Sequence, residues 1–224
     1  MHIRAITPIH IDDAELERRR ARYGRFSPPE LTVSLVNLPS GSDIPRQLAT
    51  SDDIAASDAA VARAIRALDP DEVDAALPDC VLDPGIPDRA AAAVPVHGIT
   101  ELAAGIAAAL ATPFTAVARN RAIADELDRV IARYGYRGFE PTRVLDLSFE
   151  AIADDDVWND TVAELTQGLA RTSIRHVLNG CSAVDVRPDD SGLTVFDPTR
   201  LALETLGLTI RQGLLSGGAV ASHG

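Results

Sequence analysis

The 224-residue sequence contains no lysine, so all 21 of its basic side chains are arginines. A pyridoxal Schiff base, a phosphate-loop lysine and a kinase-type strand lysine each require a primary amine. The composition therefore argues against two large classes of cofactor and nucleotide enzyme. No phosphate-binding glycine pattern occurs, and no further ligand cluster accompanies His10, Asp12 and Asp13, so we expect no metal site.

Positive charge and long apolar runs are also scarce. The 33 acidic residues give a formal net charge of -12, and an acidic surface repels the phosphates of nucleic acid. The longest apolar run, residues 102–111, is only about half of the ~20 residues that span a bilayer, and nothing resembles a secretion signal. We therefore expect a cytoplasmic, homo-oligomeric protein that binds a small molecule, with neither nucleic acid nor a membrane as partner.

Cysteine is nearly absent too, since only Cys80 and Cys181 occur, 101 positions apart. Nothing in the sequence indicates an oxidising compartment, where a disulfide between them would persist. We interpret both as free thiols.

Strand-like and helix-like segments alternate along the whole chain. Short β-branched or apolar runs are separated by segments with helical spacing, each bounded by a cap, a proline or a glycine. This alternation predicts an α/β fold with parallel sheets and helices on their faces. Strands are expected at 2–8, 31–38, 73–82, 114–118, 142–149 and 174–178, and helices at 12–23, 55–68, 99–110, 122–134, 157–169 and from Asp197-Pro198 onward.

A faint internal repeat suggests two related lobes. Val61-Ala62 lies 19 residues before Cys80, and Val162-Ala163 lies 19 residues before Cys181, each pair on a predicted helix that precedes a strand. Each thiol would then sit at the carboxyl end of a strand, where open α/β sheets bind their ligands. We predict two related lobes: residues 1–97 with 206–224, carrying Cys80, and residues 98–205, carrying Cys181.

Two thiols on opposite faces of one acidic carbon can invert the configuration of that carbon. One thiolate removes the proton, and the opposite thiol returns another to the planar carbanion. An unperturbed thiol has a pKa of about 8.5, and we expect backbone amides in the turn after each strand to lower that value. The competing interpretation is that each cysteine is a small buried hydrophobe.

The residues around the two cysteines resemble the aspartate/glutamate/hydantoin racemase superfamily, and most closely its hydantoin and allantoin racemase branch. The likeness covers nearly the whole chain and lies in residues 80–85 (CVLDPG), 95–99 (PVHGI), 180–182 (GCS) and 197–198 (DP). It implies a cofactor-independent racemase or epimerase in which Cys80 and Cys181 are the two bases. It also implies that the two α/β lobes are pseudo-symmetric, with the active site in the cleft between them. The implied substrate is a hydantoin, allantoin or an amino-acid-like carbon acid.

Five further residues are candidates for substrate binding, and several depart from the family pattern. Thr7 stands where relatives have an asparagine-rich stretch, Val81 where they have a small or aromatic residue, and Arg119 with Asn120 where they tend to have threonines. Arg119 would clamp a carboxylate, or instead pair at the surface with Asp125 or Glu126. Ser182 would donate to a substrate oxygen, or cap a helix.

Two other functions stay open at this point. The first is another superfamily enzyme, such as a maleate-type cis–trans isomerase or a decarboxylase, although decarboxylases of this kind typically keep only one of the two cysteines. The second is a binding protein that kept the lobes and lost turnover, which the altered pocket residues allow.

Overall fold

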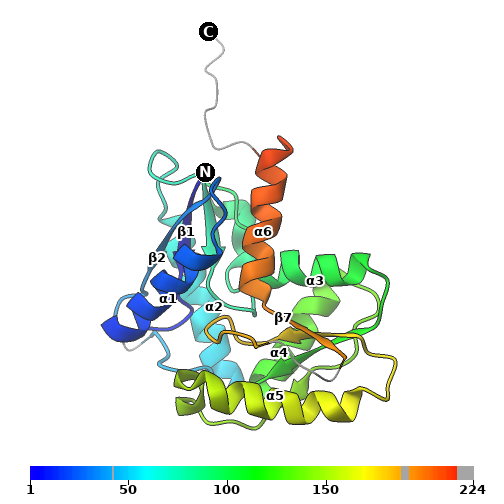
Figure 1. Ribbon diagram of the computed structural model, residues 1–224. Coiled ribbons are helices and arrows are strands. Elements are labelled where there is room, and N and C mark those ends of the chain that lie inside the picture. The colour runs from blue at the N-terminus through cyan, green and yellow to red at the C-terminus, as the bar shows by residue number, and fades with distance from the viewer. Residues whose placement is uncertain (42, 188–191, 216–224) are drawn as a thin grey trace.

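A computed structural model of the chain describes residues 1–41, 43–187 and 192–215 (Figure 1). The first lobe holds a three-stranded parallel sheet in the order β2-β1-β3. Its elements follow one another as β1 (His2–Ile6), α1 (Asp13–Phe26), β2 (Thr32–Val36), α2 (Ser51–Arg66) and β3 (Ala75–Pro78).

The second lobe repeats this plan and adds one strand. Its sheet is also parallel, in the order β5-β4-β6-β7, so that β4, β5 and β6 correspond to β1, β2 and β3. This correspondence confirms the predicted pair of related α/β lobes. The elements are β4 (Phe114–Ala118), α4 (Arg121–Tyr134), β5 (Arg143–Val144), α5 (Asp155–Leu169), β6 (His176–Asn179) and β7 (Thr194–Phe196).

The main helices begin at residues whose side chains accept hydrogen bonds from free backbone amides, as a polar cap does. Thr50 and Asp53 form a reciprocal capping box at the start of α2. The other capping side chains are Asp12 before α1, Asn120 before α4, Asp154 before α5 and Asp197 before the last helix.

Two further helices connect the lobes. α3 (Ile99–Ala109) leads from the first lobe into β4, and α6 (Pro198–Arg211) packs against both α3 and α1. The expected lobe boundary at residue 206 falls inside α6, and the division of the chain into these two lobes stays a prediction. Residues 216–224 of the expected first lobe lie outside the described residues. Short 3₁₀ helices occur at Ile86–Ala91 and Glu150–Ala153.

Most observed elements differ from the expected ranges by a few residues at their ends, and three differences are larger or have a local cause. The helix expected over 12–23 continues through the exposed Gly24 to Phe26, because a single glycine costs a helix only about 1 kcal/mol relative to alanine. The strand expected over 142–149 is only two residues long, since Asp146 takes a positive φ of 56°. β7 was not predicted, because a strand of only three residues gives too short a sequence pattern to identify.

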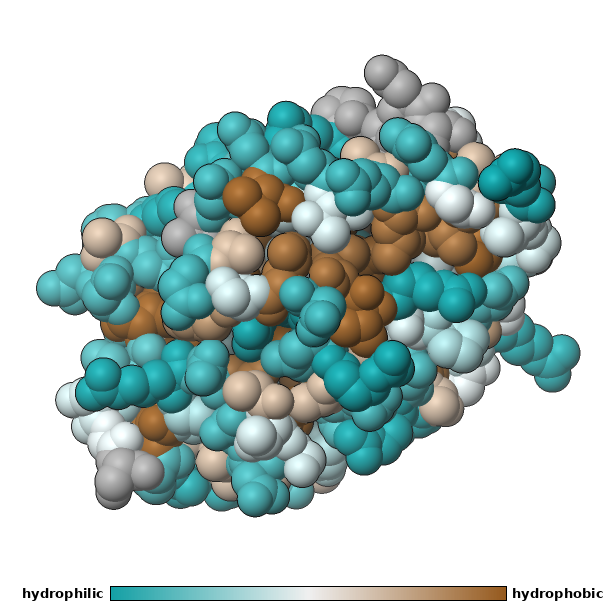
Figure 2. Space-filling view, turned by 90° about the horizontal axis from the view of Figure 1, so that it is seen from below, coloured by the Kyte–Doolittle hydropathy of each residue, from teal (hydrophilic) through white to brown (hydrophobic). Residues whose placement is uncertain are grey.

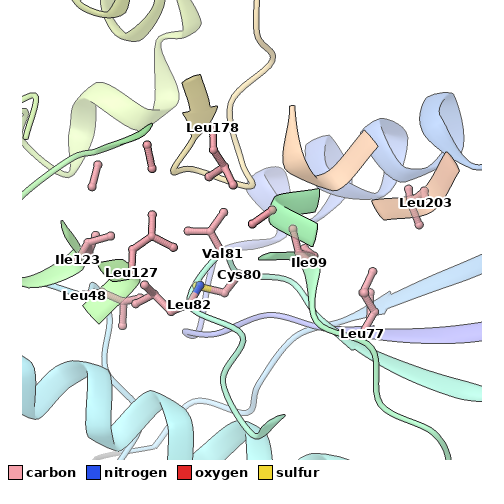
Figure 3. Close-up of a cluster of buried hydrophobic side chains, with 14 of the residues drawn as sticks. Leu48, Leu77, Cys80, Val81, Leu82, Ile99, Ile123, Leu127, Leu178 and Leu203 are labelled. Carbon is pink, nitrogen blue, oxygen red and sulfur yellow. The ribbon is translucent and has the colours of Figure 1, made fainter. Parts of the chain in front are cut away.

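The hydrophobic core is shared by the two lobes beside Cys80. Side chains after β3 pack with side chains from α4 and β6, so apolar contacts continue from one lobe to the other (Figure 3). The labelled members around Cys80 include Leu48, Val81, Leu82, Ile99, Ile123, Leu127 and Leu178.

The face in Figure 2 is mainly hydrophilic, with a band of hydrophobic residues across it. Among the described residues, the helices are all too short or too polar to cross a bilayer.

Candidate active site

The two cysteines occupy equivalent places in the two lobes. β3 ends at Pro78 and Cys80 follows two residues later; β6 ends at Asn179 and Cys181 follows two residues later. Both thiols are free. The internal spacing of the sequence therefore corresponds to a structural equivalence between the lobes.

A glycine close to each cysteine in the sequence allows the thiol-bearing segment to pack closely against the rest of its lobe. A Cβ on Gly180 would lie 1.8 Å from the carbonyl oxygen of Val117, so only glycine allows the chain to pass this close to β4. After Cys80, Gly85 takes a φ of 78° and lies against Ala62 of α2, with 3.2 Å from its Cβ direction to the Ala62 backbone. These contacts hold the two thiol-bearing segments against their own lobes.

A small cavity of about 70 Å³ lies between the lobes and is lined by both cysteines. Of the seven residues that the sequence predicts for the site, five line this cavity: Cys80, Val81, Arg119, Cys181 and Ser182.

Burial controls the ionisation of both thiols. The Cys80 side chain is 7% exposed, and burial raises its pKa to about 12, although the Leu82 amide donates to Sγ at 3.5 Å. Burial also raises the pKa of Cys181, opposed by the Ala183 amide and by the charges of Arg19 and Arg22. The turn amides do lower both pKa values as expected, but desolvation outweighs them, so each thiol pKa is raised overall.

Arg119 directly follows β4 and carries a buried charge on which the Glu150 carboxylate acts only at a distance, without forming an ion pair among the described residues. Its side chain is 6% exposed, Nη2 donates to the Leu48 carbonyl at 3.1 Å, and the guanidinium lies 5.5 Å from the Phe149 ring centre. Within the described residues it makes no ion pair, and its buried Nε has no hydrogen-bond partner.

The alternative in which Arg119 pairs with Asp125 or Glu126 is wrong. Those carboxylates pair instead with Arg121 and Arg129, because α4 turns them away from the cavity. Burial lowers the pKa of Arg119, and a negative charge on Cys181 would raise it.

Two predicted residues do not line the cavity. Thr7 is fully buried, and its hydroxyl donates to Asn37 Oδ1 at 3.1 Å and accepts from the Leu38 amide at 3.0 Å. Asn120 caps α4 through the Ile123 amide, and its Nδ2 donates to the Leu48 carbonyl at 2.9 Å. Both side chains support the segments around the cavity from behind.

Ser182 and Val81 line the cavity and also have partners in the chain. The Ser182 hydroxyl donates to the Asp79 carbonyl at 3.0 Å, which joins the two cysteine-bearing segments rather than capping a helix. The Val81 carbonyl accepts from the Thr100 hydroxyl at 2.6 Å, which ties the segment after Cys80 to α3.

A buried charged cluster behind the thiols was not predicted. Arg19 of α1 lines the cavity, is 8% exposed, and contacts Asp79 at 3.0 Å and Glu15 at 2.6 Å. The Tyr23 hydroxyl donates to the other Asp79 oxygen at 2.9 Å. The signal was the spacing of Arg19 between Leu16 and Tyr23, which places all three on one helical face.

Arg22 extends this cluster to the segment after Cys181. Its guanidinium donates to the Ser182 carbonyl at 2.5 Å and to the Val184 carbonyl at 3.0 Å, and it pairs with Asp185 and Asp197. One side chain of α1 thus holds the second thiol's loop against the first lobe.

Asp83, Pro84 and Gly85 form a turn after Cys80, and the aspartate also caps α3. The Asp83 carboxylate accepts from the amides of Thr100 at 3.0 Å and Glu101 at 2.8 Å, and from the Tyr134 hydroxyl at 2.8 Å. Burial raises the pKa of Asp83 to about 7, against the effect of these three donors.

Comparison with known proteins adds a family and a fold. A profile described as Asp/Glu/Hydantoin racemase matches residues 19–206, whereas no curated protein sequence matches the chain. Allantoin racemase from Klebsiella pneumoniae is similar in structure, with a TM-score of 0.77 at 20% identity over 99% of this chain and 91% of that one.

Two other solved structures show the same fold. Allantoin racemase from Pseudomonas fluorescens gives a TM-score of 0.79 at 17% identity, covering 99% of this chain and 95% of that one. A maleate isomerase from Pseudomonas putida S16 gives 0.61 at 14% identity, covering 95% and 92%.

Proposed function

This chain belongs to the Asp/Glu/hydantoin racemase family, and on that premise we propose that it is a cofactor-independent racemase or epimerase. Cys80 and Cys181 act as opposed acid and base on one acidic carbon. The observation that carries this proposal is that two free thiols, at equivalent strand ends of two lobes, line a single cavity. The substrate class is a hydantoin, allantoin or an amino-acid-like carbon acid.

The charges around the two thiols differ, and this difference favours Cys181 as the resting base. Asp79 disfavours both thiolates, but Arg19 and Arg22 favour the thiolate of Cys181, whereas Asp83 further disfavours that of Cys80. When Cys181 is the base, its thiolate removes the proton from the stereocentre, and the Cys80 thiol donates its proton to the opposite face of the same carbon. The enzyme is left with a Cys181 thiol and a Cys80 thiolate, which is the form that runs the reverse reaction.

Arg119 supplies the positive charge that the carbanion needs. Proton removal places negative charge on an oxygen of the substrate, and a fixed cation in a buried site stabilises such charge strongly. Burying a cation without a counter-ion is costly, and a substrate carboxylate or enolate oxygen would offset that cost. General acid–base catalysis adds roughly 10²–10⁴-fold per group.

A second candidate is a cis–trans isomerase of the maleate type. The unpaired guanidinium of Arg119 suits a dicarboxylate, and a maleate isomerase shares the fold. This enzyme would change the geometry of a double bond instead of inverting a stereocentre.

Solvent-deuterium exchange tests the proposal. The panel is single-enantiomer hydantoins, allantoin, aspartate, glutamate and maleate, each incubated in D₂O and read by mass spectrometry and chiral chromatography. We expect deuterium at the stereocentre of one substrate, and loss of racemisation in both Cys80→Ser and Cys181→Ser. Normal exchange in both variants would refute the two-base mechanism, and turnover of maleate alone would favour the isomerase.

A further inference from the structure

A second and larger pocket lies next to the thiol cavity, on the side of Cys80. It measures about 260 Å³ and is lined by α2 and α4 together with the turn after Cys80. It shares three lining residues with the small cavity: Leu48, Cys80 and Leu82. Cys181 lines the small cavity only, so the two thiols differ in what lies beside them. We call this second space the α2–α4 pocket.

Leu48 forms the wall between the two spaces. It is buried, and Figure 3 shows it beside Leu82 and Cys80. Its carbonyl accepts hydrogen bonds from Arg119 at 3.1 Å and Asn120 at 2.9 Å, both from the second lobe.

The residues after Leu48 are fixed as well. The Ala49 and Thr50 amides donate to Asp53 at 3.1 Å and 2.9 Å, as part of the cap of α2. The wall is thus held by the second lobe at its carbonyl and by α2 immediately after it. The backbone hydrogen bonds therefore fix where the wall lies, and the size of the Leu48 side chain determines how completely it separates the two spaces.

The α2–α4 pocket offers both donors and acceptors. Arg133 makes no ion pair within the described residues, and Arg129 pairs with Glu126 at 3.0 Å. On the α2 side, Asp58 uses Oδ1 to accept from the Gly85 amide at 2.8 Å, which leaves its other oxygen as an acceptor. A guanidinium on one wall and a carboxylate on the other match a group that carries both C=O and N–H.

We propose that the α2–α4 pocket holds a carboxamide-like substituent of the substrate's stereocentre, and that Leu48 limits how far this substituent extends. The inference rests on the proposed function, because the reacting carbon between the thiols is what places its substituent at the Leu48 wall. Leu48 is therefore a specificity-determining residue, and the substituent leaves the small cavity past Cys80.

Thiol labelling tests the pocket without any turnover. Three reagents share one warhead: iodoacetamide, its glycinamide derivative with a carboxamide tail, and its N-isobutyl derivative with an apolar tail of similar size. The rate at each cysteine is followed by peptide mass spectrometry at one alkaline pH. In the unaltered protein we expect Cys80 to prefer the carboxamide tail over the isobutyl tail about tenfold, or about 1.4 kcal/mol. Cys181 should show no such preference.

Shortening Leu48 should open the pocket to Cys80 alone. Leu48→Ala removes three carbons of the wall, and we expect the tailed reagents to label Cys80 about tenfold faster, with Cys181 unchanged. Leu48→Val, a milder change, should give a smaller rise in the same direction. Leu38→Ala is the matched control, because Leu38 is a buried leucine of the same lobe that lines neither space.

Equal changes at both thiols, no change at Cys80 in either Leu48 variant, or the same tail preference at both thiols would overturn the proposal. These outcomes differ from failure of the proposed function, which would appear as absent deuterium exchange while the labelling pattern stayed as expected.

Discussion

The hydroxyl of Ser182 donates a 3.0 Å hydrogen bond to the carbonyl of Asp79, and each of these residues is the covalent neighbour of one thiol-bearing cysteine. The bond runs between the lobes, so it sets the distance between the two thiol segments directly. No other hydrogen bond between described residues joins the immediate neighbours of both cysteines in this way.

Ser182→Ala should lower activity more than stability. Loss of one buried hydrogen bond costs about 1 kcal/mol of unfolding free energy, whereas a small misplacement of opposed acid and base is expected to slow exchange by about tenfold or more. Urea unfolding and deuterium exchange measure the two effects. Ser173→Ala is the control, because Ser173 makes only an exposed 3.4 Å bond to Glu140. Equal losses in both variants would contradict the role of the bond.

Arg119→Met should change activity and stability in opposite directions. Removing an unpaired buried charge is expected to raise the unfolding free energy by about 1 kcal/mol, while kcat/KM falls by roughly 100-fold because the developing oxyanion loses its cation. Arg121→Met, which removes an exposed arginine that pairs with Asp125 at 3.7 Å, should change neither. A fall in stability of Arg119→Met would show that the charge is compensated within the fold.

The Arg19–Asp79 pair should show strong coupling in a double-mutant cycle. Arg19→Met leaves the Asp79 carboxylate buried and unpaired, and we expect a loss of about 3 kcal/mol. Arg19→Met combined with Asp79→Asn should recover most of this loss, since no unpaired charge remains. Arg20→Met, at an exposed position of the same helix, serves as the control in urea unfolding. Additive losses would mean that the pair is not an energetic unit.

Asp83 should make stability fall as the pH rises from about 4 toward 7. Burial raises the pKa of Asp83 from 3.8 to about 7, so over this range the native state holds a proton that the unfolded state has lost. The unfolding free energy then decreases with pH, by at most about 1.4 kcal/mol per pH unit. The difference between the unaltered protein and Asp83→Asn, followed by urea unfolding across this range, isolates the contribution. A difference that grows with pH in the opposite sense would contradict this ionisation.

The sequence predicted the thiols far better than their surroundings. A cysteine at a strand end is visible in the order of short apolar runs and turns, so Cys80 and Cys181 could be placed at equivalent positions of two lobes. Thr7 directly follows β1 as Arg119 directly follows β4, and both were candidates for substrate binding. The Arg119 side chain nevertheless lines the cavity, whereas the Thr7 side chain bonds to the segment after β2. The position of a residue at a strand end does not determine which way its side chain points.

Long-range pairing explains most of what was missed. Arg19 meets Asp79 across 60 positions of sequence, and Arg22 meets the Ser182 carbonyl across 160. In the sequence, the run of arginines in α1 is typical of an exposed helix, and only the packing of α1 beneath the cysteines converts two of them into buried charges. The direction of the thiol pKa values was missed for the same reason, since burial depends on the assembled lobes.

The hydrogen bonds of Arg22 to the Ser182 and Val184 carbonyls have a consequence for how a substrate would be selected. They lock α1 of one lobe onto the loop of the other, so swinging the lobes apart would strip a buried guanidinium of its partners. Substrate selection then depends on how well a molecule fits the preorganised cavity between the thiols. None of the free energy of substrate binding is needed to close a hinge between the lobes. Adaptation to a new substrate would accordingly proceed by exchanging side chains along the rim, while the frame that holds the two sulfurs stays rigid.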